Sequence, residues 1–190
     1  MSPAARRAPR RPAKAKQAKA AAGFTPVLRD LLTARGPSGY ETAPASVWRE
    51  AASGFAQVST DVVGTPHALV VPRRGFQKDA RRLLVMGHID EIGLIVTHID
   101  DDGYLWFREV GGWDAQILVG QRVVLDTRGG TVPGVIGKKP IHLLRDEERK
   151  KVAEIRDLHI DIGASNGEEA RKLVRIGDVA VIDAEPLELP

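Results

Sequence analysis

The stretch Leu83-Leu84-Val85-Met86-Gly87-His88-Ile89-Asp90-Glu91-Ile92-Gly93 decides how the rest of the sequence is interpreted. It opens with a continuous apolar run of strand length, which is typical of a strand buried on both faces in a parallel sheet covered by helices. The run ends in His-x-Asp and a glycine-flanked loop. Catalytic groups in such sheets gather at the carboxyl ends of the strands, so we expect a functional site at this point.

His88 and Asp90 stand two positions apart at the end of this predicted strand. Side chains at positions i and i+2 of a strand point to the same side, which brings the imidazole and the carboxylate together. The arrangement suits a metal-binding histidine whose ring is oriented by a carboxylate behind it. The same two residues would also suit a hydrogen-bonded pair without a metal, and the motif alone does not separate these interpretations.

The composition limits the kinds of protein and of metal site. The chain has 190 residues, 43% of them hydrophobic and 28% charged, as in an ordinary globular protein of one or two small domains. It has no cysteine, so disulfides and thiolate ligands are excluded, and any metal must be held by His, Asp or Glu. That ligand set favours hydrolytic zinc, cobalt or manganese chemistry. Because no apolar stretch approaches the roughly 18 residues of a membrane-spanning helix, we expect a cytoplasmic protein without a membrane partner.

Residues 1–22 form a basic tail that differs from the rest of the chain. They hold seven basic residues and no acidic one, and they consist mostly of Ala, Pro, Lys and Arg, a composition typical of disordered segments. The rest of the chain holds 21 basic and 25 acidic residues, so its net charge is about −4, against +3 for the whole. The tail lacks the apolar region of a secretory signal. Any nucleic-acid binding would be weak and would come from this tail.

The chain ahead of the opening stretch is expected to form the first part of an α/β layer. One helix is predicted to begin at Pro26, where proline at the first helical position is favourable. The Ser-x-x-Glu spacing of Ser38 and Glu41 is typical of a capping box at the start of a second helix. Strands are predicted at residues 55–60 and 67–71.

After Gly93 the sequence becomes rich in short β segments. Asp101-Asp102-Gly103 is a predicted hairpin turn. Short helices are predicted at residues 146–155 and 167–174, the latter behind a Ser165-x-x-Glu168 capping box. Several short strands joined by glycine turns indicate a small barrel inserted into the α/β layer. The strands are predicted at residues 94–99, 104–110, 121–126, 131–136, 158–162 and 179–182.

A second His-x-Asp occurs at His98-Ile99-Asp100. It leads directly into the predicted hairpin turn and lacks the flanking pattern of a parallel strand. We therefore interpret it as a partly exposed pair of the barrel and not as a metal site. The histidines at positions 67, 142 and 159 stand singly, without spaced partners.

Seven motifs occur in an order that resembles one enzyme family. From Phe24 to Pro190 the chain is similar to the N-terminal half of the glutamyl and deblocking aminopeptidases. These are dinuclear-metal enzymes that form tetrahedral shells, and some are labelled endoglucanases. The motifs are GPSGYE at residues 36–41, GHIDEIG at 87–93, VTHID at 96–100, GGWD at 111–114, GQRV at 120–123, GKKPIHLL at 137–144 and DIGA at 161–164.

The resemblance implies a fold, a reaction and a site. The fold is α/β: a partial α/β/α zinc-peptidase sandwich with an inserted PDZ-like β-barrel that serves assembly. The reaction is the removal of N-terminal residues from peptides by water activated between two divalent ions, zinc or cobalt. His88 matches a terminal metal ligand, and Asp90 matches the carboxylate that orients it. The implied partners are peptide substrates and further copies of the chain, from a dimer to a tetrahedral dodecamer.

The resemblance also implies how the chain is divided into parts. Comparison with the family's motifs further indicates where the sequence differs from the family. The expected parts are residues 1–22 for the tail, 23–92 for the first catalytic part, 93–178 for the barrel and 179–190 for the return into a truncated catalytic domain. The family's Leu-Asp-Asp/Asn-Arg segment with the bridging aspartate, its catalytic Glu-Glu pair and its last metal ligands would come later. Neither Asp183 nor Glu185 lies in a matching context.

We therefore expect the 190-residue chain alone to bind zinc or cobalt weakly or not at all and to be inactive, since a zinc site needs about three protein ligands. The alternative function is a non-catalytic assembly or binding module built on the barrel.

Overall fold

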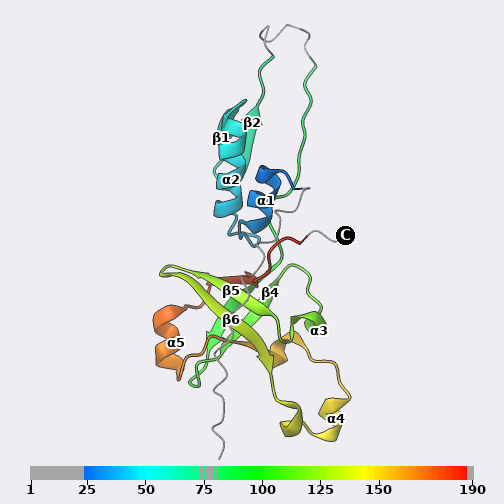
Figure 1. Cartoon of the computed structure of the whole chain (residues 1–190), viewed down its shortest axis with the longest axis vertical. Coiled ribbons are helices and arrows are strands. Elements are labelled where there is room, and N and C mark those ends of the chain that lie inside the picture. The colour runs from blue at the N-terminus through cyan, green and yellow to red at the C-terminus, as the bar shows by residue number, and fades with distance from the viewer. Residues whose placement is uncertain (1–23, 73–74, 76–78, 80, 188–190) are drawn as a thin grey trace, which may run out of the picture.

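The computed structural model describes residues 24–72, 75, 79 and 81–187 and shows a small helical layer above a β-barrel (Figure 1). The basic tail lies outside these residues. Within them, no helix has both the length and the apolar character needed to cross a bilayer.

Two helices and one hairpin form the helical layer. They are α1 (Pro26–Thr33), α2 (Thr42–Ser53), β1 (Gln57–Thr60) and β2 (Pro66–Leu69), with β1 and β2 paired antiparallel. Helix α1 begins as predicted, with proline in the first turn and the Thr25 side chain accepting a hydrogen bond from the Leu28 amide.

The layer buries little of its own apolar surface within the described residues. Helix α1 has no buried residue, and Leu28 and Leu32 on its predicted apolar face are 42% and 52% exposed. Helix α2 buries only Pro44, Ala45 and Ala52. An amphipathic pattern predicts that the apolar face of a helix is covered by other protein surface. Within the described residues, little such surface covers these two helices.

The capping box predicted for α2 is wrong. Glu41 is the N-cap residue, but its side chain makes no capping bond to the helix, and its carboxylate accepts a hydrogen bond from the Gly39 amide. Ser38 lies before the helix, where its hydroxyl bonds to Asp90. The Ser-x-x-Glu spacing therefore reflects a loop and not a helix start.

The second predicted capping box is shifted by one residue. Asn166, not Ser165, is the N-cap of α5 (Gly167–Leu173), and its side chain accepts a hydrogen bond from the Glu169 amide. The Glu169 carboxylate accepts a bond from the Ser165 amide in return. The pair Asn166 and Glu169 thus replaces the predicted pair Ser165 and Glu168.

Six antiparallel strands close into a barrel in the order β3-β4-β7-β6-β5-β8. They coincide with the six predicted β segments after Gly93. The strands are β3 (Gly93–Ile99), β4 (Leu105–Val110), β5 (Arg122–Thr127), β6 (Gly130–Lys138), β7 (Leu158–Asp161) and β8 (Val179–Ile182).

Strand β8 closes the barrel by pairing with both β3 and β5. Ala180 lies opposite Leu94 on one side and Leu125 on the other. The expected boundary at residue 178 therefore falls inside the barrel, because the strand expected to return to the catalytic domain supplies the last two ladders of hydrogen bonds.

The hydrophobic core lies inside this barrel. A bulge in β3 between Val96 and His98 leaves Thr97 and His98 exposed and returns Ile99 to the interior. The buried cluster comprises Leu94, Val96, Ile99, Leu105, Phe107, Leu118, Val123, Leu125, Ile136, Leu158, Ile160, Ala170, Val174 and Ala180.

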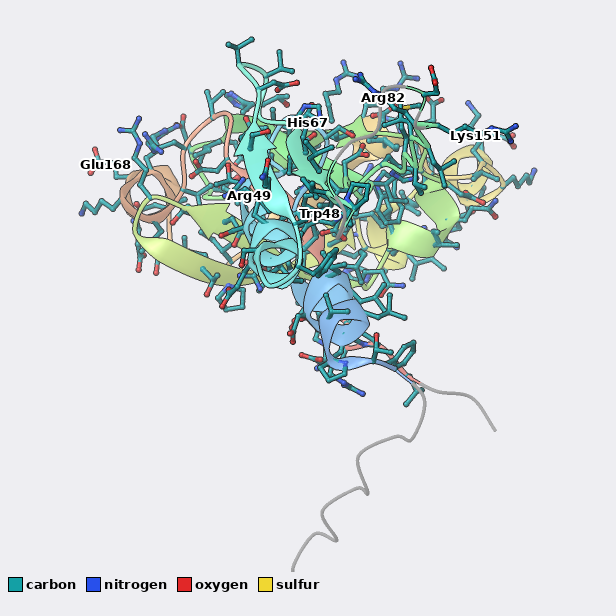
Figure 2. All side chains as sticks on the ribbon, turned by 90° about the horizontal axis from the view of Figure 1, so that it is seen from above. Trp48, Arg49, His67, Arg82, Lys151 and Glu168 are labelled. Carbon is teal, nitrogen blue, oxygen red and sulfur yellow. The ribbon has the colours of Figure 1, made fainter. Side chains whose placement is uncertain are left out.

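Short helices connect the strands. They are α3 (Ala115–Leu118), η1 (Ile141–Leu143), α4 (Asp146–Arg149), η2 (Ile155–Asp157) and α5. The helix predicted over residues 146–155 is therefore shorter than expected. Viewed from above, Glu168 on α5 and Lys151 after α4 lie at opposite ends of the barrel, with Trp48, Arg49 and His67 of the helical layer between them (Figure 2).

Candidate metal-binding site

Residues 81–90 run from the hairpin side toward the barrel without forming a strand (Figure 1). This corrects the prediction of a strand buried on both faces, because the four apolar side chains of residues 83–86 are 78–89% exposed. A strand needs hydrogen-bonded neighbours. Among the described residues, such pairing begins only at Glu91, which forms a single parallel bridge with Pro37.

The loop of residues 36–41 holds the end of this segment. The Glu91 amide donates a 3.0 Å hydrogen bond to the Gly36 carbonyl oxygen, and the Gly36 amide donates a 3.0 Å bond to Glu91 Oε1. The Tyr40 amide donates to the Pro37 carbonyl oxygen at 2.7 Å. The backbone on both sides of Ser38 is therefore fixed.

His88 and Asp90 are hydrogen-bonded to each other, although residues 81–90 do not form the strand on which the predicted closeness rested. His88 Nδ1 lies 3.0 Å from Asp90 Oδ1 and 3.2 Å from the Asp90 carbonyl oxygen. An ionised carboxylate and a carbonyl oxygen only accept hydrogen bonds, so Nδ1 carries the proton. The lone pair of Nε2 is then available, on a side chain that is 86% exposed.

Ser38 holds the other oxygen of the same carboxylate. Its hydroxyl donates a hydrogen bond to Asp90 Oδ2, so the three side chains are connected in the order Ser38, Asp90, His88. In a nucleophilic triad the serine bonds to the histidine, which takes its proton. Here the serine faces the carboxylate, so the arrangement orients an imidazole and does not activate a nucleophile.

The hydrogen bonds also favour the ionised form of Asp90. The bond from Ser38 has the largest effect and the bond from His88 the next, and together they lower the pKa of Asp90 below its ordinary value of 3.8. At neutral pH the carboxylate therefore remains an acceptor for the Nδ1 proton.

The role of Ser38 was not predicted from the sequence, which instead indicated a helix cap at this residue. The signal that could have drawn attention to it was its place in the GPSGYE motif, the first of the seven family-like motifs. The contact with Asp90 joins residues 52 positions apart, and no local spacing rule relates them.

The donor set fits one ligand position of a metal site. Metal-binding histidines commonly donate their other ring N–H to a carboxylate, which fixes the tautomer and the orientation of the ring. His88 with Asp90 has this form. Across residues 24–72, 75, 79 and 81–187, no group of three or more His, Asp or Glu side chains is placed to hold a metal ion. His88 thus offers one ligand atom, Nε2, and the pair by itself is not a complete site.

The second His-x-Asp does not form a pair. Asp100 accepts a 2.9 Å hydrogen bond from the Tyr104 amide and a 2.8 Å bond from Trp106 Nε1, so its carboxylate closes the hairpin between β3 and β4. His98 is exposed on β3, where it lines a hollow of about 450 Å³ with Arg171 and Arg175. Both residues therefore belong to the barrel surface.

The other candidate residues are apart from this site. His67 Nε2 lies 3.4 Å from the Asp61 carboxylate in the helical layer, and the His159 ring packs against the ring of Tyr104, with centroids 4.4 Å apart. Asp183 and Glu185 are exposed after β8.

Comparison with known proteins identifies the family. A family model for M42 glutamyl aminopeptidases matches residues 68–190. The chain belongs to this family. Among its curated members, the lysyl aminopeptidase of Pyrococcus furiosus is 37% identical over 106 residues, which cover 55% of this chain and 31% of the relative. The matches to curated relatives span 28–40% of the relatives' lengths.

Solved structures of TET peptidases have the same fold over most of this chain. The TET aminopeptidase of the marine sediment archaeon Thaumarchaeota archaeon SCGC AB-539-E09 superposes with a TM-score of 0.75 at 41% identity, covering 82% of this chain and 43% of the archaeal one. The Pyrococcus horikoshii TET1 peptidase, which can assemble into a tetrahedron or a large octahedral shell, superposes with a TM-score of 0.72 at 38% identity, covering 83% and 46%. A structure from Thermotoga maritima described as an endoglucanase superposes with a TM-score of 0.69 at 32% identity, covering 84% of this chain and 45% of the other.

Proposed function

We propose that this chain is part of a metal-dependent aminopeptidase that removes N-terminal residues from peptides. The observation that carries the proposal is the hydrogen bond from His88 Nδ1 to Asp90, which leaves Nε2 free as a ligand. Membership of the M42 family supports the reaction class.

In this proposal each residue of the site has a defined task. Two divalent ions, zinc or cobalt, would when bound supply Lewis-acid chemistry that activates water and polarises the scissile carbonyl group. His88 Nε2 would hold one of the ions. Asp90 keeps the ring oriented and its proton on Nδ1. We assign the general base to none of the described residues.

The proposal includes the architecture and the partners of the whole protein. The helical layer would belong to an α/β/α catalytic sandwich, and the barrel would be a PDZ-like assembly domain of a cytoplasmic homo-oligomer, from a dimer to a tetrahedral dodecamer. The assembly of the Pyrococcus horikoshii relative supports the oligomer. The exposed apolar side chains of residues 83–86 support a sandwich that needs further protein surface, because large exposed apolar patches mark interfaces.

One observation favours a second function, a non-catalytic assembly or binding module. The barrel is closed and has its own hydrophobic core, whereas the segment that carries His88 is exposed. A closed barrel can present a binding surface without any contribution from the His88 site.

Aminopeptidase turnover on unblocked peptides, with cobalt or zinc added, separates the two functions. We expect no turnover by the 190-residue chain alone and metal-dependent turnover when it is joined to the C-terminal part of a family relative. In the joined protein, His88→Ala should abolish turnover and Asp90→Asn should lower it about 10–100-fold. His98→Ala serves as the matched control and should change turnover little, because His98 lies on the barrel surface.

Three outcomes would contradict this account. Metal-dependent turnover by the chain alone would mean that the described residues hold more metal ligands than His88. A folded joined protein that is inactive would favour the non-catalytic module. A joined protein that stays active after His88→Ala would show that His88 is not a required metal ligand.

A further inference from the structure

We propose that Ser38 is a positioning residue that presents His88 Nε2 for metal binding by holding the Asp90 carboxylate. This inference rests on the proposed function of His88, but it makes a claim about the metal-free protein that can be tested separately. It assigns a function to the GPSGYE loop at residues 36–41. The motif at residues 87–93 contains His88 and Asp90 but does not account for that loop.

The need for Ser38 follows from the freedom of the Asp90 carboxylate. The last torsion of an aspartate side chain is broad, so a single hydrogen bond to His88 would not fix the plane of the carboxylate. The Ser38 bond to Oδ2 leaves Oδ1 as the oxygen that faces His88 Nδ1. The imidazole is 86% exposed, so packing does little to hold its orientation, and hydrogen bonds must do so.

Ser38 can impose this orientation because its own position is fixed. Pro37 beside it is buried and bridges to Glu91. Pro37 also packs against Gly93, where an added Cβ would come within 2.7 Å of the proline ring. The backbone of Ser38 is thereby anchored to the chain just after His88 and Asp90, within hydrogen-bonding reach of the Asp90 carboxylate.

The structure argues against two other roles for Ser38. It is not a helix cap, because Glu41 occupies the N-cap position of α2. It is not a nucleophile, because its hydroxyl bonds to a carboxylate and not to a histidine nitrogen. The remaining function of the hydroxyl is to orient the carboxylate.

The tautomer of His88 in the metal-free chain tests the inference directly. Long-range ¹H–¹⁵N NMR distinguishes a proton on Nδ1 from one on Nε2. We expect His88 to be mainly the Nδ1–H tautomer in the natural sequence, to shift toward Nε2–H in Ser38→Ala, and to return in Ser38→Thr, which keeps the hydroxyl. Ser59→Ala, at an exposed serine of β1, is the matched control, and His159 of β7 in the barrel is an internal reference in every spectrum.

Two results would overturn the inference: a His88 tautomer that is unchanged in Ser38→Ala, or one that shifts equally in Ser38→Thr. If Ser38→Ala disturbs the fold, as shown by changes at His67 and His159, Ser38→Val provides the same comparison, because it has the shape of Ser38→Thr without the hydroxyl.

Zinc affinity of the joined protein separates this inference from the proposed function. We expect Ser38→Ala to lower the affinity by about tenfold, the lower end of the range for outer hydrogen-bond partners. If the tautomer shifts but His88→Ala leaves zinc binding intact, Ser38 positions His88 and the proposed metal role fails. If His88→Ala removes zinc while Ser38→Ala changes neither tautomer nor affinity, the metal role stands and the inference about Ser38 fails.

Discussion

The Tyr40 hydroxyl donates a 2.8 Å hydrogen bond to the carbonyl oxygen of Gly177, two residues before β8. Tyr40 belongs to the loop that carries Ser38, so this bond connects the candidate site to the barrel. A second connection runs from Arg35 Nε to Asp126 Oδ1 of β5, 3.0 Å apart. The helical layer and the barrel therefore meet through polar contacts, with the site loop at the junction.

Tyr40→Phe should weaken this junction. The substitution removes one hydrogen bond and keeps the ring, so we expect the free energy of unfolding to fall by about 0.5–1.5 kcal/mol in denaturant titrations. Tyr104→Phe is the matched control, because within the described residues the Tyr104 hydroxyl makes no hydrogen bond and its ring still packs on His159. Equal stability of Tyr40→Phe and the natural sequence would show that the bond contributes nothing.

The barrel should fold by itself only if β8 is included. Residues 93–187 contain all six strands and the buried cluster, so we expect a cooperative thermal transition and a soluble species without aggregates in sedimentation. Residues 93–178 lack β8 and leave β3 and β5 with unpaired edges, which promote aggregation. A soluble, cooperative 93–178 fragment would mean that closure by β8 is dispensable.

Replacing a leucine by alanine should have a large effect on stability at one position and a small effect at another. Leu105 is fully buried in the barrel, and Leu105→Ala should lower the free energy of unfolding by about 2–5 kcal/mol. Leu83 is 89% exposed, and Leu83→Ala should change it by less than about 0.5 kcal/mol. A large loss of stability for Leu83→Ala in the chain alone would show that residues 83–86 are covered in solution.

Asp100 should make the barrel sensitive to acid. Burial opposes its ionisation, but the hydrogen bonds from Trp106 Nε1 and the Tyr104 amide outweigh burial and lower the pKa of Asp100 below 3.8. A carboxyl with a lowered folded-state pKa adds stability above its unfolded pKa and loses it as the pH falls through the folded value. We expect the melting temperature of the natural sequence to exceed that of Asp100→Asn at pH 7, with the difference shrinking below about pH 4. A difference that does not depend on pH would exclude the charge as its cause.

Deleting residues 1–22 should leave the melting temperature unchanged, because Met1 is the only large apolar side chain of the tail. It should lower any affinity for DNA, since non-specific binding depends on basic contacts and falls with salt. Filter binding of both chains at two salt concentrations measures this. DNA binding that survives the deletion undiminished would place the basic surface elsewhere.

Local patterns in the sequence determined most of the secondary structure. The Thr25-Pro26 start of α1, the hairpin turn before Tyr104 and the six β segments depend on residues close together in the chain, so spacing rules find them. His88 and Asp90 are also close neighbours in the chain, but the strand predicted to bring their side chains together is absent. The N-cap of α5 was predicted at Ser165 and lies at Asn166, one residue later, because both neighbouring residues can cap a helix.

Only the tertiary structure decided the features that depend on contacts between distant segments. The apolar pattern of residues 83–86 indicates a preference for burial, but burial needs strands and helices on both sides, which the described residues do not supply. Whether β8 belongs to the barrel depends on its pairing with β3 and β5, more than 50 residues earlier. The bond from Ser38 to Asp90 exists because Glu91 and Gly36 hold two remote segments together. The spacing of residues along the sequence does not predict such contacts, because the distance between two remote residues is set by the path of the folded backbone.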